Sequence, residues 1–131
     1  MTACVFCKII KNELFAHKIF EDDNFLVILD AFPSILGQVL VIPKKHSMTN
    51  LFDLNKKDYG EVLLITKRVA RAIQNALKPI KVGLVVEGLE IEHLHLKLFP
   101  LTLKGLILKP LTDKPSEGIM KALAKKISDS F

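Results

Sequence analysis

A long helical stretch in the middle of the chain limits the possible folds more than any other feature. Asn55 is a suitable helix N-cap, and Asp58 lies three residues further on, in the first turn. Apolar residues then recur at helical spacing over about four turns before Pro79 stops the run. These residues are Val62, Ile65, Val69, Ile73 and Leu77. The pattern predicts one long amphipathic helix.

Short apolar runs on both sides of this helix are typical of strands. Strands are predicted at 18–20, 25–30, 39–42, 82–86 and 93–99, with a further candidate at 106–108. Pro43 should stop the strand at 39–42, because proline cannot donate to a central ladder. A short helical segment is expected at 6–10, and Ser116 can cap a last helix. Together these elements predict a single α+β domain over 1–131, with a mainly antiparallel sheet, a long central helix and a C-terminal helix.

Composition and charge indicate the cellular location of the protein and the kind of partner it binds. The 131 residues carry a net charge of +5, which favours anionic partners. A nucleic-acid face is not expected, because no strand pattern of aromatic and basic residues accompanies the charge. No apolar run is long enough to span a bilayer, and the N-terminus has no signal-peptide pattern. We therefore expect no membrane partner and an intracellular location, cytoplasmic with the nucleus also open.

Cys4 and Cys7 are the two cysteines of the chain. In a reducing compartment their Cys-x-x-Cys spacing indicates a metal pair or a redox pair rather than a structural disulfide. Two thiolates together with His46 and one histidine of 93–95 would match the tetrahedral preference of Zn²⁺. The alternative is two unbonded cysteines and an unrelated surface histidine.

The strand at 93–99 carries the second chemical pattern. Polar and apolar residues alternate up to Leu98, so His93, His95 and Lys97 share one face. A neutral imidazole is a good nucleophile toward phosphorus near pH 7, and a neighbouring ammonium can stabilise phosphoryl oxygens. A purely structural role for these histidines is the alternative reading.

Two polar residues lie where strands end or begin. Asp30 follows a buried strand, where it can cap the next turn or accept hydrogen bonds from a ribose diol. Gln38 follows Gly37 at the entry to the next strand. Its amide can hold a neighbouring side chain or a ligand oxygen, or simply close the loop.

Four segments, in order, resemble the zinc-binding branch of the histidine triad (HIT) family. They are 4–10 (CVFCKII), 18–30, 37–46 (GQVLVIPKKH) and 93–99 (HLHLKLF), so the resemblance covers about residues 4–100, and 101–131 form a tail with the last helix. The resemblance implies a HIT-like fold, a two-fold dimer, and hydrolysis of nucleoside phosphoramidates or dinucleoside polyphosphates.

The resemblance also assigns roles to individual positions. It implies a structural zinc ion held by Cys4, Cys7, His46 and His93. It places His95 on the nucleophile that takes up a nucleoside monophosphate, and Asp30 on the ribose-binding acid. Phe6, Ile9 and Ile28 fall on the pocket that holds the base of a purine nucleotide such as AMP.

Three departures from the family pattern concern the phosphate. Lys97 stands in place of the third triad histidine, and Gln38 in place of the histidine expected after Gly37. The stretch between Val86 and His93 is several residues shorter than usual and lacks a Gly-Gln-Ser-type sequence. The leading hypothesis is a nucleotide hydrolase in which Lys97 and Gln38 hold the phosphoryl oxygens. The rival is a degenerate relative that acts as a nucleotide sensor or an interaction module.

Overall fold

The structure is a computed structural model that describes residues 4–131. Its elements follow the chain as α1 (Val5–Ile10), β1 (Lys18–Glu21), β2 (Phe25–Leu29), β3 (Val39–Pro43), the 3-10 turn η1 (Leu51–Asp53), α2 (Lys56–Leu77), β4 (Lys81–Val85), β5 (Leu96–Leu101) and α3 (Glu117–Ser128).

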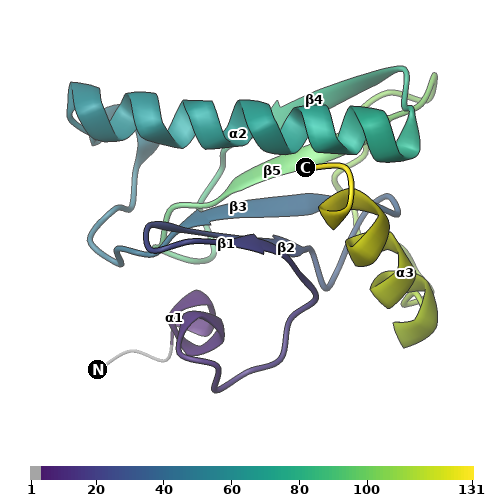
Figure 1. Cartoon of the computed structure of the whole chain (residues 1–131), viewed down its shortest axis with the longest axis horizontal. Helices are drawn as coiled ribbons and strands as arrows, with labels where there is room; N and C mark the ends of the chain where they lie inside the picture. The colour runs from purple at the N-terminus through teal and green to yellow at the C-terminus, as the bar shows by residue number, and fades with distance from the viewer. Residues whose placement is uncertain (1–3) are drawn as a thin grey trace.

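The five strands form one antiparallel sheet in the order β1-β2-β3-β5-β4. The long helix α2 covers one face of this sheet, and the short helix α1 lies on the other face (Figure 1). Helix α3 packs against α2 and β1. The predicted α+β class, with an antiparallel sheet, a long central helix and a C-terminal helix, is confirmed.

Alternation along the central strands divides the core between the two faces. In β2, Val27 and Leu29 face the main core under α2 and α3, whereas Leu26 and Ile28 face a smaller cluster that also contains Phe6 and Ile9 of α1. Both faces of β2 and β3 are covered, which explains why these strands read as unbroken apolar runs. The smaller cluster is the one that positions the functional residues.

The helix caps agree with the sequence. The Asn55 side chain accepts a hydrogen bond from the Asp58 amide at 2.8 Å, and Ser116 accepts one from the Ile119 amide at 3.2 Å. Each side chain satisfies an amide that has no partner within its helix. Within residues 4–131, no helix is both long and apolar enough to cross a membrane.

Three strand predictions need correction. Strand β3 continues through Pro43, because β5 pairs with β3 only from Val39 to Val41 and leaves the proline without a ladder partner on that side. Strand β5 begins at Leu96 rather than at residue 93, since the Leu94 amide bonds the Met48 carbonyl at 2.8 Å instead of β3. Residues 106–108 form no strand and belong to the irregular segment before α3.

Candidate functional site

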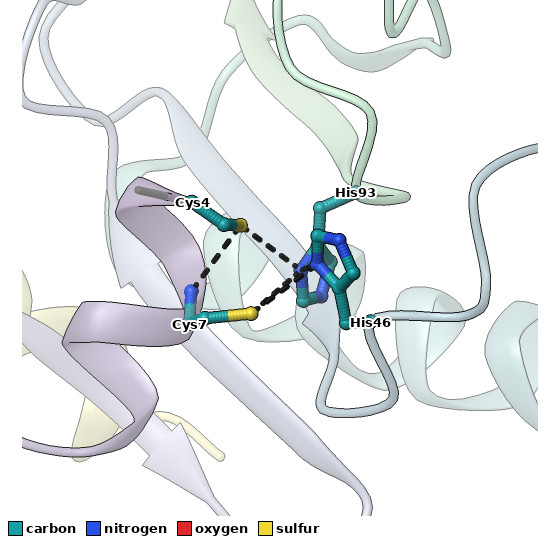
Figure 2. Close-up of side chains that lie close together, drawn as sticks. All are labelled: Cys4, Cys7, His46 and His93. Carbon is teal, nitrogen blue, oxygen red and sulfur yellow. Dashed lines mark hydrogen bonds between the residues drawn. The ribbon is translucent and has the colours of Figure 1, made fainter. Parts of the chain in front are cut away.

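The two cysteines and two histidines meet between α1 and the start of β5. Cys4 caps α1 and Cys7 lies within it, while His46 belongs to the loop after β3 and His93 to a bend shortly before β5. Figure 2 shows the four side chains pointing toward one another. Residues far apart in the sequence thus converge on one point.

The donor atoms of this cluster are close together. The Cys4 Sγ atom lies 3.4 Å from His93 Nδ1, and Cys7 Sγ lies 3.3 Å from His46 Nδ1. The two Nδ1 atoms are 3.2 Å apart, and all four ligand atoms lie within 4.8 Å of one another. This is a four-ligand cluster that can hold a metal ion.

His93 is oriented by a backbone carbonyl. Its Nε2 donates to the Pro43 carbonyl at 2.7 Å, so the other ring nitrogen, Nδ1, carries the lone pair that faces the thiols. The ring is fully buried, and burial lowers the pKa of His93, with His46 and His95 acting in the same direction. A neutral imidazole fixed by an outer hydrogen bond is the form that binds metals.

The surroundings of Cys7 favour its protonated thiol. Burial and the neighbouring Cys4 raise the pKa of Cys7, whereas Lys11 lowers it. A raised pKa makes a thiol a weaker spontaneous nucleophile. Deprotonation then depends on a cation at the cluster, because metal binding displaces the thiol proton.

A cavity of about 340 Å³ lies beside this cluster, on the α1 face of the sheet. Every position predicted to bind nucleotide or to act in catalysis lines it: Phe6, Ile9, Ile28, Asp30, Gln38, His95 and Lys97. They come from α1, β2, the loop between β2 and β3, the residue just before β5, and β5 itself. The fold therefore brings the predicted set together in one hollow, separate from the metal cluster.

His95 is the best-placed nucleophile in the cavity. Its Nδ1 donates to the carbonyl of His93 at 2.8 Å, which leaves the lone pair on Nε2. The residue lines the cavity although it is only 7% exposed. Burial, the largest effect, lowers the pKa of His95. The hydrogen bond to the His93 carbonyl raises it, Lys97 lowers it by less, Asp30 and Glu87 raise it, and the net result is a lowered pKa. The ring is therefore neutral at pH 7.

Phe6 lies between the cavity and the group of two cysteines and two histidines. Its ring packs against His95 with centroids 4.9 Å apart and against His93 at 5.8 Å. Because Phe6 lies between Cys4 and Cys7 on α1, the position of this wall depends on how α1 is held.

The Gln38 side chain contacts neighbouring protein groups. Its side chain accepts hydrogen bonds from Ser34 and donates to Asp30 Oδ2 at 2.7 Å. The amide is thus engaged with protein groups at the cavity wall, which is the neighbouring-side-chain role that the sequence left open.

Some cavity residues were not predicted from the sequence. Glu87 and Glu90 come from the segment before His93, Phe32 from the loop after β2, and Leu108 and Pro110 from the irregular segment before α3. The shortened stretch before His93 marked a change in the phosphate region, but no pattern in residues 102–115 pointed to the cavity.

A larger hollow of about 760 Å³ lies elsewhere, near the end of β5. Its lining is mainly leucine and isoleucine, and among the described residues it holds no histidine, cysteine or carboxylate. The smaller cavity holds the histidine and the carboxylates, so it is the candidate active site.

Comparison with known proteins identifies the family. The HIT domain profile matches residues 11–102, which is most of the chain. The chain belongs to the HIT family. An uncharacterised HIT-like protein of Borreliella burgdorferi is 39% identical over 84 residues, covering 64% of this chain and 60% of that protein.

Two further comparisons bear on chemistry. The adenosine 5'-monophosphoramidase hnt1 of Schizosaccharomyces pombe is 35% identical to this HIT protein over 54% of its chain and 53% of the yeast protein. A zinc-bound histidine triad family protein of Mycobacterium smegmatis matches 98% of the chain and 92% of its own, with a TM-score of 0.80 and 27% identity. The chain spans less than two thirds of the length of the two sequence relatives named here.

Proposed function

We propose that this HIT protein binds a purine nucleotide such as AMP in the cavity and hydrolyses a nucleoside phosphoramidate through a phosphohistidine at His95. The observation that carries the proposal is the state of His95: Nδ1 is tied to a carbonyl, the ring is neutral, and the residue lines a cavity. The name of the yeast relative, a monophosphoramidase, supports the same reaction class.

The reaction needs two displacements at phosphorus. His95 Nε2 forms a bond to the α-phosphorus while the bond from phosphorus to the leaving amine breaks, and the departing nitrogen takes one proton from solvent. Water then attacks the phosphohistidine, the bond from Nε2 to phosphorus breaks, and one proton returns to solvent. Lys97, which lines the cavity two residues from His95, offers its positive charge to the phosphoryl oxygens.

The apolar half of the cavity supports base binding. Phe6, Ile9 and Ile28 line it and are each at most 7% exposed. Such side chains offer apolar contact but no hydrogen-bond donor. We assign the base to this half and the ribose to Asp30, so that the α-phosphate lies toward His95.

The charge of the cavity favours a phosphoramidate over a dinucleoside polyphosphate. Its lining has three carboxylates, Asp30, Glu87 and Glu90, against one lysine, Lys97, although the chain as a whole carries +5. A polyphosphate leaving group would bring several negative charges toward these carboxylates. An amine leaving group brings none, and a basic amine would be attracted.

Zn²⁺ is the proposed resident metal. Ions bound at about 2.3 Å to sulfur and about 2.0–2.1 Å to nitrogen in tetrahedral geometry place their ligands roughly 3.3–3.8 Å apart. Four of the six donor separations lie at 3.2–3.6 Å, close to this range, and all six lie within 4.8 Å. Cys4, Cys7, His46 and His93 would fill all four positions, so the ion would have a structural role.

We also propose a homodimer, as the family resemblance implies. Strand β4 lies at the edge of the sheet, and Ile80 and Leu84 beside and within it are 62% and 47% exposed. Leu64 on α2 is 65% exposed. An open edge next to apolar side chains is a surface that a second copy can cover. Light scattering on the purified chain tests this.

The enzyme proposal is tested with a fluorogenic adenosine phosphoramidate. We expect turnover by the metal-loaded protein, its loss in His95→Ala, and its retention in His17→Ala, a histidine outside the cavity. Glu87→Gln together with Glu90→Gln should lower the preference for a phosphoramidate over a dinucleoside polyphosphate. Tight AMP binding without turnover by the wild type would instead favour a nucleotide sensor, which the loss of phosphate-directed histidines at 38 and 97 would explain.

A further inference from the structure

Two buried polar side chains beside the cavity are not used by the proposed reaction. Ser34 is 5% exposed and Gln38 is 4% exposed. The Gln38 Oε1 atom accepts hydrogen bonds from the Ser34 amide at 2.7 Å and from the Ser34 hydroxyl at 3.0 Å. Burying a polar group is costly unless it is hydrogen-bonded. The burial of these two polar side chains at this place therefore calls for an explanation.

These bonds fix the orientation of the Gln38 amide. A backbone N–H can only donate, so the Gln38 atom that faces the Ser34 amide must be the oxygen. The nitrogen, Nε2, consequently faces Asp30 Oδ2 at 2.7 Å, where a carboxylate can only accept. The hydrogen bonds therefore run from Ser34 to Gln38 and from Gln38 to Asp30, and each of them pairs a donor with an acceptor.

The Asp30 carboxylate is held at both oxygens. Oδ1 accepts from the Phe32 amide at 2.9 Å, and Oδ2 accepts from Gln38. Each oxygen of an ionised carboxylate can accept a second hydrogen bond. Because Asp30 lines the cavity, the two remaining acceptor sites are available to a pair of neighbouring hydroxyl groups, as in the 2′,3′-diol of ribose.

The backbone around Gln38 is fixed by a hydrogen bond and by the conformation of Gly37. The Asp30 amide donates to the Gln38 carbonyl at 2.9 Å, which closes the loop between β2 and β3. Gly37 has φ +91°, and a Cβ there would meet Leu77 Cδ1 at 2.5 Å. The loop thus takes its shape from a glycine packed on α2, and that shape presents the Gln38 side chain to Asp30.

We propose that Gln38, backed by Ser34, is a positioning residue that sets Asp30 for the ribose diol and so makes the site select ribonucleotides over 2′-deoxyribonucleotides. This rests on the proposed nucleotide function and reassigns Gln38 from the phosphate to the sugar. A neutral amide suits the task, because it orients the carboxylate without forming a competing ion pair.

Calorimetric titration with AMP and with 2′-deoxy-AMP tests the proposal. The metal-loaded wild type should bind AMP about tenfold or more tightly than 2′-deoxy-AMP, as expected for a hydrogen bond to a charged group. Gln38→Glu keeps the shape of the side chain but replaces the Nε2 donor by an oxygen. At pH 8 it should therefore bring the ratio of AMP affinity to 2′-deoxy-AMP affinity close to one. Ser34→Ala should give an intermediate ratio, and Gln74→Glu, the same change on the exposed surface of α2, should leave it unchanged.

The ratio separates positioning from simple destabilisation, since a loosened cavity weakens both nucleotides together. Metal content and thermal unfolding of each variant identify any that fail to fold, and Ser34→Ala then serves in place of Gln38→Glu. An unchanged ratio in the folded variants, or a wild-type ratio near one, overturns the proposal while nucleotide binding stands. Absence of AMP binding by the wild type overturns the proposed function itself.

Discussion

Removing the proposed metal should weaken α1 first and the proposed nucleotide cavity with it. Both thiol ligands, Cys4 and Cys7, lie at the start of α1, whereas His46 and His93 belong to the body of the domain. A helix of six residues is too short to persist by itself. We therefore expect chelation to free α1, and with it the wall formed by Phe6.

The stability lost on metal removal can be estimated from ion binding and from side-chain burial, and the two estimates are similar. An ion that binds only the folded state and is present at about 1,000 times its dissociation constant stabilises that state by about 4 kcal/mol. Undocking α1 exposes Phe6 and Ile9, which are 4% and 7% exposed. Burying two such side chains contributes about 3–6 kcal/mol. With an unfolding entropy of about 2.1 cal/mol/K per residue, a loss of about 4 kcal/mol lowers the melting temperature by roughly 15 °C.

Calorimetric unfolding with and without a chelator measures the loss, and elemental analysis gives the metal content. Cys7→Ser should reproduce the chelated state, while His17→Gln, outside the cluster, should respond to chelator as the wild type does. AMP affinity should fall together with stability. A chelated protein that melts within about 2 °C of the loaded one, or a wild type with well under one metal per chain, would refute the reasoning.

Two other predictions concern pH and the loop before β3. Because burial lowers the pKa of His95 and Lys97 lowers it further, kcat/KM should be level from about pH 7 upward and fall as pH drops through that lowered pKa. Lys97→Met removes a cation, so the pKa of His95 should rise, and the fall of kcat/KM at acid pH should begin at a higher pH. An unchanged pH profile would contradict the assignment of His95 as the nucleophile. Gly37→Ala should cost about 1–3 kcal/mol in urea unfolding, since a side chain is strained at its φ of +91° and the added Cβ would also crowd Leu77. Gly60→Ala, with open space around its Cβ on α2, should not be destabilising.

Local patterns in the sequence were sufficient to predict most elements. The spacing of apolar residues and the caps Asn55 and Ser116 gave α2 and α3, because those signals depend only on neighbours along the chain. Continuous apolar runs gave β2 and β3. The limits of β3 and β5 were predicted less well, since a strand ends where its neighbour stops pairing, and Pro43 is tolerated only because β5 does not reach it.

The metal ligands and the cavity residues could be proposed from the sequence because their chemistry is carried by residue type and by the family pattern. Their convergence, and the divergence of His93 from His95, required the packing of α1 against the sheet. The sequence alone determined which groups are available: two thiols, the histidines, Asp30 and Lys97. Only the tertiary structure decided that Gln38 faces Asp30 and that Glu87 and Glu90 border the cavity, because hydrogen-bond partners and local charge depend on distances between segments that are remote along the chain.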